Sequence, residues 1–299
     1  MKVHAEAKPL TAPLPGGRPG ASVVVEPLKV GEVQAPHGFF ERPGGHLETA
    51  RILATPRSRW WWVPCPAFLV RHPSYGPFVV DTGLHSSVSA KPTANLGRAV
   101  SWISRARLEP GHDLPAQLRE RGIDSRALKL VVMTHLHIDH SSGMAEFPRA
   151  TFVLSEEEWL AATTDSSPLI HGYRPEHYDY VFDYRTVGYR DGVESYSTFG
   201  RTFDLFGDGS VRLASTPGHS AGHQCVICRL ADRDLVIAGD AVYTLGQLDD
   251  KPGPARPFDP HTFRRSLQEL RLFARQYPQA VIIPSHDPDL WANLDERYS

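Results

Sequence analysis

The chain has 299 residues, of which 41% are apolar, 10% aromatic and 22% charged. This composition is typical of a folded globular protein and excludes a disordered or fibrous chain. Lysine and arginine number 32 against 34 aspartates and glutamates, which gives a formal net charge of −2. Such a balance provides no overall attraction for nucleic acid or an anionic membrane, so we expect neither as a partner.

Targeting signals are absent from the sequence as it stands. It contains no uncharged apolar run near 18 residues, and the start MKVHAEAKPLTAPLPGGRPG lacks the apolar core of a signal peptide. We therefore expect a cytoplasmic protein. The three cysteines Cys65, Cys225 and Cys228 are too few for a disulfide framework. Cys225 and Cys228 form a C-x-x-C pair, but in the strand-like stretch HQCVICRL they would point to opposite faces, which favours two ordinary strand residues.

The N-terminal half is predicted to form an arm followed by strands. Residues 1–21 are rich in proline and glycine, and we expect a flexible arm there, with residues 22–299 forming one domain. Strand-like runs follow at 22–31, 60–72, 76–83, 128–135 and 150–155. Ser155 followed by Glu158 is a capping-box signature, which predicts a helix beginning at SEEEWLAA.

A region without periodicity interrupts this pattern between about residues 163 and 200, and eight tyrosines and phenylalanines accumulate between 173 and 199. It is either a lid over a pocket or a dimer contact, with plain packing as the remaining alternative. Short strands resume at 210–216, 224–230 and 234–240. Asp259 and Pro260 then predict the start of an amphipathic helix, and AVIIP at 280–284 a last strand.

Possible metal ligands are concentrated directly after the strand at 128–135. His135, His137, Asp139 and His140 fall within six residues. Because side chains alternate along an extended chain, the H-x-H pair points both imidazoles to one side, where they can bind one ion. Asp139 and His140 come where the chain turns away and can face a second ion. Clustered histidines also occur on ordinary surfaces, but four such residues in this order after an apolar strand favour a metal site.

Three further candidates follow later strands, namely His219 in STPGHSAGH, Asp240 in VIAGD and His286 in IIPSHD. Taken singly, Asp240 could cap a turn and His286 could be a surface residue. Together with the first cluster they supply five histidines and two aspartates, enough for two neighbouring ions. Nitrogen and carboxylate ligands without thiolate suit zinc first, with iron, manganese or cobalt as alternatives.

These motifs resemble the metallo-β-lactamase superfamily, whose H-x-H-x-D-H signature stands at 135–140. VVDTG at 79–83, TPGH at 216–219, GD at 239–240 and SH at 285–286 follow in the family's order. The resemblance implies an α/β fold, the αββα sandwich, over roughly residues 60–290. It also implies one metal held by His135, His137 and His219, a second held by Asp139, His140 and His286, and Asp240 as the bridge. Asp81 and His223 would lie in the outer shell of the site.

Tyr243 follows Asp240 by three residues, a spacing that resembles the N-acyl-homoserine lactonases of the superfamily. Its alternative is an ordinary half-buried tyrosine. The resemblance implies a quorum-quenching hydrolase in which a hydroxide bridging two metal ions attacks the lactone carbonyl. Tyr243 would stabilise the tetrahedral intermediate and Asp139 would relay a proton to the leaving alkoxide. Aromatic candidates for an acyl groove are Phe39, Phe40, Trp60–Trp62 and the aromatic insert after Thr163, with ordinary core and rim packing as the alternative.

Other functions are compatible with the same residues. A related hydrolase could act on another lactone, an ester, a thioester or an organophosphate. The position of His137, where the di-iron oxidoreductase branch of the superfamily has glutamate, argues against flavin-coupled redox chemistry. A non-catalytic metal-binding protein is the alternative from another class, although such proteins usually lose a ligand and all seven are present here. A homodimer is suggested by the resemblance and by the aromatic insert.

Overall fold

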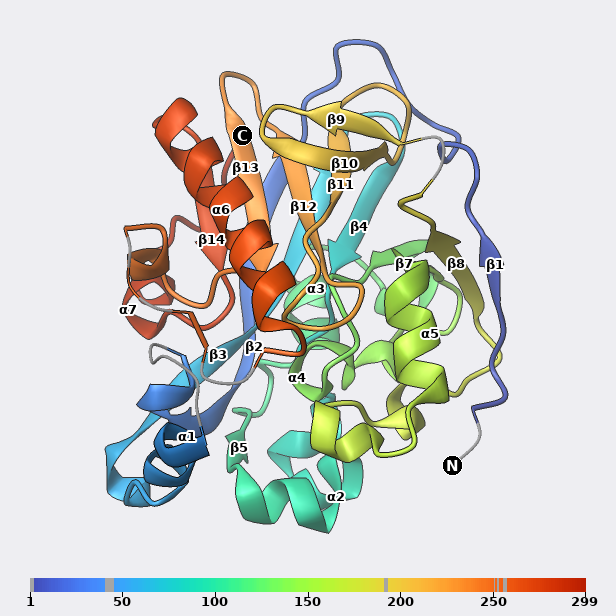
Figure 1. Ribbon diagram of the computed structural model, residues 1–299. Helices are drawn as coiled ribbons and strands as arrows, with labels where there is room; N and C mark the ends of the chain where they lie inside the picture. The colour runs from blue at the N-terminus through green and yellow to red at the C-terminus, as the bar shows by residue number, and fades with distance from the viewer. Residues whose placement is uncertain (1–2, 41–45, 191–192, 250, 252, 255–256) are drawn as a thin grey trace.

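Two β-sheets packed face to face form the centre of the molecule (Figure 1). The computed structural model describes residues 3–40, 46–190, 193–249, 251, 253–254 and 257–299. The strands are β1 (Ala7–Pro9), β2 (Val24–Pro36), β3 (Trp60–His72), β4 (Gly76–Val80), β5 (Ala106–Arg107), β6 (Leu130–Val132), β7 (Thr151–Ser155), β8 (Asp183–Val187), β9 (Glu194–Tyr196), β10 (Phe199–Asp204), β11 (Val211–Ser215), β12 (Gln224–Arg229), β13 (Asp234–Gly239) and β14 (Val281–Pro284). The larger sheet has the order β1-β8-β7-β6-β4-β3-β2-β5, and the smaller has the order β14-β13-β12-β11-β10-β9.

The helices are α1 (His46–Leu53), α2 (Pro92–Ile103), α3 (Leu114–Glu120), α4 (Ile138–Ser141), α5 (Glu156–Thr164), α6 (Pro260–Gln276) and α7 (Pro288–Trp291). Of these, α3 and α5 cover the outer face of the larger sheet and α6 covers that of the smaller sheet. Short 3-10 turns connect them at η1 (His37–Phe39), η2 (Arg57–Arg59), η3 (Ser86–Ser89), η4 (Ser125–Ala127), η5 (Met144–Glu146), η6 (Pro168–His171), η7 (Pro175–His177) and η8 (Leu245–Gln247). This layering is the predicted αββα sandwich.

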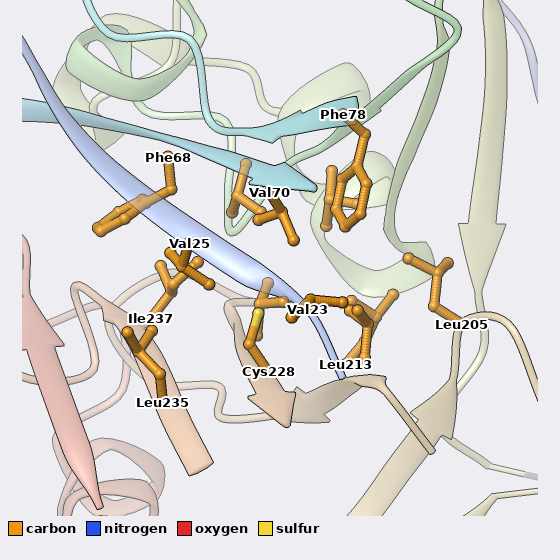
Figure 2. Packing of buried hydrophobic residues seen from close by; sticks show 14 of the residues in the cluster. Val23, Val25, Phe68, Val70, Phe78, Leu205, Leu213, Cys228, Leu235 and Ile237 are labelled. Carbon is orange, nitrogen blue, oxygen red and sulfur yellow. The ribbon is translucent and has the colours of Figure 1, made fainter. Parts of the chain in front are cut away.

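Successive side chains along a strand point to opposite faces of its sheet, so the strands contribute to three hydrophobic cores, one between the sheets and one under the helices of each outer face. In β6, Leu130 and Val132 point between the sheets while Val131 points outward to the helices. In β12, Cys228 faces the core between the sheets and Cys225 faces α6, as the sequence predicts for this pair. Figure 2 shows the side chains of the two sheets meeting in the central core. Because both faces of these strands are buried, they read as continuous apolar runs.

The predicted helices begin at their expected caps. The Asp259 side chain accepts a hydrogen bond from the backbone N–H of His261 at the start of α6, and Ser155 accepts one from the N–H of Glu158 at the start of α5. The capping box at α5 is one-sided, because the Glu158 carboxylate bonds to other loops. The helix predicted from this signature is present.

The aromatic region at 163–200 contains more regular structure than its sequence predicts. Its described part includes η6, η7, β8, β9 and the start of β10. β8 pairs with β7 and with β1, which are contacts between segments distant in sequence that local periodicity does not reveal. Tyr173, Tyr178, Tyr184 and Tyr189 are all at most 2% exposed, so these four aromatic rings pack inside the protein.

The described part of the N-terminal segment, residues 3–21, lies along the domain, whereas we expected a flexible arm. β1 pairs in parallel with β8, and Leu10 and Leu14 pack against the central core. The segment is held by backbone pairing and by a few apolar contacts, which the surrounding proline and glycine residues do not indicate. The division of the chain at residues 21 and 22 stays a prediction.

The strand ends determine where the functional residues meet. β4 pairs in parallel with β6, and β13 in parallel with β14, so their carboxyl ends lie at the same edge of each sheet. The segments that follow these four strands carry Asp81, the cluster at 135–140, Asp240 and His286. None of the helices that the structure describes combines the length and apolar composition needed to cross a lipid bilayer.

Candidate metal centre

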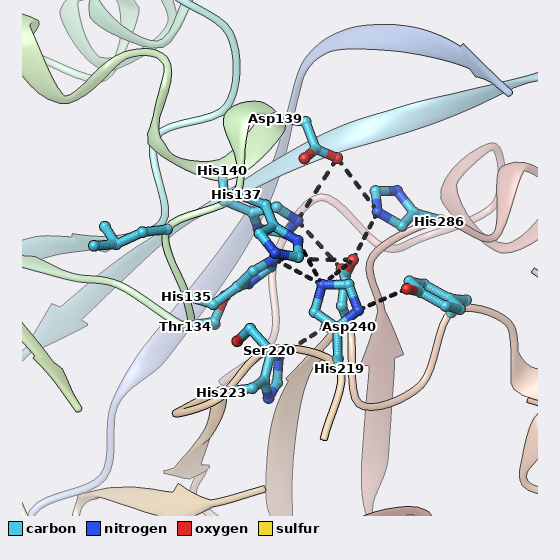
Figure 3. A network of polar contacts seen from close by, with 12 residues as sticks. Thr134, His135, His137, Asp139, His140, His219, Ser220, His223, Asp240 and His286 are labelled. Atoms are coloured by element: carbon cyan, nitrogen blue, oxygen red, sulfur yellow. Dashed lines mark hydrogen bonds and ion pairs between the residues drawn. The ribbon is translucent and has the colours of Figure 1, made fainter. Parts of the chain in front are cut away.

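The seven predicted ligands converge from four segments of chain, as Figure 3 shows. His135 follows β6, His137 precedes α4, and Asp139 and His140 lie within α4. His219 comes from the loop between β11 and β12, and Asp240 and His286 follow β13 and β14. Their possible ligand atoms form three groups, each with all atoms within 4.8 Å of one another. The groups are His135, His137 and His219; His135, His140 and Asp240; and Asp139, His140 and His286.

The first group brings three ring nitrogens to one point. Nε2 of His219 lies 3.1 Å from Nε2 of His135 and 2.8 Å from Nδ1 of His137. Burial lowers the pKa of all three imidazoles, with the neighbouring histidines adding to this effect. They are therefore neutral and have lone pairs available, which is the state in which histidine binds a metal ion.

The two remaining groups combine imidazoles with carboxylates. Nε2 of His286 lies 3.4 Å from the Asp139 carboxylate and 3.2 Å from that of Asp240. The Asp240 carboxylate is also 3.2 Å from Nε2 of His140 and 3.3 Å from Nε2 of His219. Asp240 thus lies between His219 on one side and His140 and His286 on the other, in the position expected of a bridging ligand.

The buried atoms of this cluster fit cations. Nε2 of His140 and Oδ1 of Asp240 are buried and find no hydrogen-bond partner among the described residues. Burial opposes a proton on His140, yet the carboxylates of Asp240, Asp81 and Asp139 raise its pKa. This negative potential, together with convergent nitrogen lone pairs, would be satisfied by divalent metal ions of the kind that take histidine and carboxylate ligands.

Asp81 orients part of the cluster from behind. Its carboxylate accepts hydrogen bonds from Nδ1 of His140 at 2.7 Å, from the N–H of Thr134 at 2.7 Å and from the Thr134 hydroxyl at 2.7 Å. With Nδ1 protonated in this way, Nε2 of His140 is left to bind a metal. Asp81 adopts a φ of 57°, which costs energy for a residue other than glycine and is maintained here by these three bonds.

Two more contacts orient ligands through the backbone. Nε2 of His223 accepts a hydrogen bond from the N–H of Asp240 at 2.9 Å, and burial lowers the pKa of His223 to about 3. His223 is therefore a neutral acceptor that positions the backbone of Asp240. Nδ1 of His286 donates to the carbonyl of Pro64 at 3.0 Å, which directs Nε2 into the site.

Tyr243 contacts the cluster through His219, with its hydroxyl 2.7 Å from Nδ1 of that ring. If Nε2 of His219 binds a metal, the ring proton is on Nδ1 and is donated to the tyrosine oxygen. The hydroxyl hydrogen of Tyr243 then stays available for another acceptor. Burial, with the charges of Asp240 and Asp139, raises the pKa of Tyr243 well above its usual value, so the phenol keeps its proton.

The cluster opens into two adjoining hollows. A largely apolar cavity of about 380 Å³ is lined by apolar residues that include Phe39, Phe40, Trp60 and Val63, and by Asp139, Asp240, Tyr243 and His286 of the cluster. A second hollow of about 480 Å³ is lined in part by His137, His171, Tyr173, His219 and Phe258. Of the five aromatic residues named individually for a groove, Phe39, Phe40 and Trp60 line the apolar cavity. Trp61 packs on His37 and Trp62 on Arg107.

Comparison with known proteins identifies the family. A match to the metallo-beta-lactamase superfamily spans residues 60–286, which is most of the chain and includes every candidate ligand. The chain belongs to the metallo-beta-lactamase superfamily. Within it, the chain is 31% identical over 236 residues to a protein of Rhizobium radiobacter named N-acyl homoserine lactonase AttM, covering 78% of this chain and 85% of that protein. It is also 24% identical over 216 residues to N-acyl homoserine lactonase AiiA of Bacillus thuringiensis subsp. kurstaki, covering 71% of this chain and 77% of that protein.

Solved structures of the superfamily share this fold. An N-acyl homoserine lactone hydrolase with N-hexanoyl-L-homoserine bound at its metal centre superimposes with a TM-score of 0.70 at 18% identity, covering 94% of this chain and 98% of that one. The enzyme class expected from the sequence, a metal-dependent hydrolase, agrees with these relatives. The superfamily is known for divalent metal binding, and the histidine and aspartate groups here suit it.

Several residues around this superfamily site were not singled out as site residues from the sequence. Glu158 was interpreted only as a helix cap, yet its carboxylate contacts two ligand-bearing loops. Thr134 precedes the signature by one residue and carries the Asp81 contact. His171 lines the second hollow and its Nδ1 lies 2.6 Å from the Asp165 carboxylate. The sequence offers no spacing signal for His171, because η6 brings it to the site through the fold.

Proposed function

We propose that this protein hydrolyses N-acyl-homoserine lactones at a site for two divalent metal ions. The observation that carries this proposal is the direct junction between the ligand cluster and an apolar cavity, with Tyr243 at the boundary. A homoserine lactone joins a polar ring to an apolar acyl chain, and its two halves match these two environments. The relatives named N-acyl homoserine lactonases support the same choice.

The metal ions would supply Lewis acidity and a water of lowered pKa. His135, His137 and His219 would hold one ion, Asp139, His140 and His286 the other, and Asp240 would bridge them. Zinc suits this donor set best, because it contains nitrogen and carboxylate ligands without thiolate.

The chain's own residues would bind and polarise the substrate. Tyr243 has a hydroxyl hydrogen available once His219 donates to its oxygen, and that hydrogen can stabilise negative charge developing on the lactone carbonyl oxygen. Asp139 is the more open of the two carboxylates, 20% exposed against 4% for Asp240. It lies at the cavity wall and can pass a proton to the alkoxide that leaves when the ring opens.

The acyl chain would lie along the aromatic side of the cavity. Phe39, Phe40 and Trp60 provide apolar surface in the same cavity that the ligand cluster lines. Burial of methylene groups there is favourable by about 0.8 kcal/mol each, so longer acyl chains should lower KM until the cavity is full. This cavity would make the protein a quorum-quenching lactonase with a preference for an apolar acyl chain.

The test is a direct comparison of substrates with purified, zinc-loaded protein. We expect a kcat/KM of about 10⁴ M⁻¹s⁻¹ or more on a medium-chain N-acyl-homoserine lactone, above the values for an aryl ester and an aryl phosphotriester. Protein stripped by a chelator should lose the activity and regain it when zinc is restored. An intact lactone beside rapid turnover of the ester or the phosphotriester would refute the lactonase proposal and leave a different metallohydrolase.

A further inference from the structure

Glu158 is a buried carboxylate whose hydrogen bonds go to the loops that carry the proposed metal ligands. Its side chain lies in the first turn of α5 and the residue is 0% exposed. Oε1 accepts a hydrogen bond from the N–H of Leu136 at 3.0 Å. Oε2 accepts from the Ser220 hydroxyl at 2.6 Å and from the N–H of Gly222 at 3.0 Å. Three donors thus satisfy one buried charge, which makes the arrangement stable despite the loss of water.

The three donors come from the two loops that carry the first ligand group. Leu136 lies between His135 and His137, and Ser220 directly follows His219, beside which it appears in Figure 3. Gly222 precedes His223, which holds the backbone of Asp240. His135 and His219, which lie in contact, are 84 residues apart in the sequence. The distance between the two loops in space therefore depends on tertiary contacts such as these.

The second loop also presses closely on the start of α5. A Cβ atom added at Gly222 would lie 2.1 Å from the backbone nitrogen of Glu158 and 2.5 Å from Oγ of Ser155. No side chain fits in that space, so glycine at this position allows the loop backbone to reach the carboxylate. Glycine at position 222 is therefore needed for the contact between this loop and Glu158.

We propose that Glu158 is a positioning residue that fixes the distance between the two ligand-bearing loops, so that His135, His137 and His219 converge on one metal ion. The inference rests on the metal site of the proposed function and not on the identity of the substrate. The ligands of the other group have separate supports, since Asp81 orients His140 and the carbonyl of Pro64 orients His286. Loss of the Glu158 charge should therefore weaken the binding of one of the two ions.

The test compares metal binding by Glu158→Gln and wild type, using zinc in competition with a chromophoric chelator. Glutamine keeps the size of the side chain but replaces one acceptor with an NH₂ donor, which would oppose an N–H of Leu136 or Gly222. We expect one of two ions to bind at least tenfold more weakly, in the range typical for residues behind metal ligands. The rise in unfolding temperature on adding zinc should shrink in the variant.

Glu157→Gln is the matched control, because it makes the same change at the neighbouring glutamate of the same helix, whose side chain is 31% exposed and lies near Arg190. It should leave the zinc affinity and the rise in unfolding temperature on adding zinc unchanged. If Glu158→Gln behaves like this control, the proposed role is overturned. Should Glu158→Gln fail to fold, Ser220→Ala removes a single donor, and a fall of a few-fold in the affinity for one ion is expected, whereas unchanged affinity would overturn the proposal. Wild-type protein that binds no zinc would overturn the metal site itself along with this inference.

Discussion

Tyr243 shows how one hydroxyl can belong to two parts of a site. Its oxygen lies 2.7 Å from Nδ1 of His219, and its ring packs edge-on against Phe40 in the apolar cavity with centroids 5.5 Å apart. The sequence predicts a phenol directed at the substrate. In the structure the same phenol also contacts His219, and if Nε2 of that histidine binds a metal, Nδ1 carries the ring proton and donates it to the tyrosine oxygen.

Replacing Tyr243 by phenylalanine should therefore lower turnover of a homoserine lactone by about a hundredfold to a thousandfold, because a donor to the developing oxyanion is lost. The zinc content should stay at the wild-type value. Steady-state kinetics and metal analysis on the same samples check both parts. Tyr196→Phe is the control, since Tyr196 lies on β9, the edge strand of the smaller sheet, and its hydroxyl donates to the Asp234 carboxylate. Equal turnover in Tyr243→Phe and wild type would remove Tyr243 from the mechanism.

At the scale of elements, α6 illustrates a helix whose position follows from its pattern. Phe263, Leu267 and Leu270 are buried against the smaller sheet, where they meet Ile227 and Val236. Leu272, on the opposite face of the helix, is 45% exposed. The loop of His219 packs near the start of this helix, where the N–H of Asp259 donates to the carbonyl of Gly218 at 3.0 Å. Packing of α6 thus contributes to the position of His219, a proposed metal ligand.

Leu270→Ala should lower the free energy of unfolding by about 2 to 5 kcal/mol, because it removes buried methyl groups and leaves a cavity. Leu272→Ala, on the same helix, should change it by less than about 0.5 kcal/mol. Urea unfolding of the zinc-loaded proteins measures both values. Similar losses in the two variants would contradict the orientation of α6 described above.

At the scale of the whole molecule, a buried pair joins three distant segments. Nε2 of His72, at the end of β3, lies 3.0 Å from the Asp208 carboxylate in the turn between β10 and β11, and the two side chains are 0% and 2% exposed. Asp208 also accepts a hydrogen bond from the N–H of Arg18 at 2.7 Å. The N-terminal segment and both sheets are therefore connected at the edge opposite the metal centre.

This pair predicts a dependence of stability on acid pH. Burial raises the pKa of Asp208, but hydrogen bonds from Ser210, Arg18 and His72 outweigh it and lower the pKa to about 2. A carboxyl whose pKa is lower in the folded state stabilises the protein above about pH 4, and this stabilisation is lost as the pH falls toward 2. The difference in free energy of unfolding between wild type and Asp208→Asn should thus shrink by about 2 kcal/mol over this range.

Chemical unfolding at several pH values measures this difference, with Asp232→Asn as the control at an aspartate whose side chain is 68% exposed. The control should follow wild type at every pH. A constant difference between Asp208→Asn and wild type from pH 4 to pH 2 would show that the Asp208 charge does not contribute to stability.

Local features of the sequence were sufficient for much of the fold. The alternation of apolar residues indicates β6 and β12, the caps Ser155 and Asp259 mark the starts of two helices, and both features depend on neighbours within a few residues. The ligand cluster at 135–140 is visible for the same reason, since the four residues are adjacent in the chain. His219, Asp240 and His286 were indicated by their positions after strands and by the family's order of motifs.

Tertiary structure alone decided what depends on distant contacts. β1 and β8 pair with strands far away in sequence, so the proline-rich segment at 1–21 and the aromatic insert gave no strand signal. The role of Glu158 was equally hidden, because a helix cap and a carboxylate bridging two loops need the same residue at the same spacing. Residue spacing records which side chains can point the same way, whereas the partner of a buried polar group depends on which loops the sheets bring together.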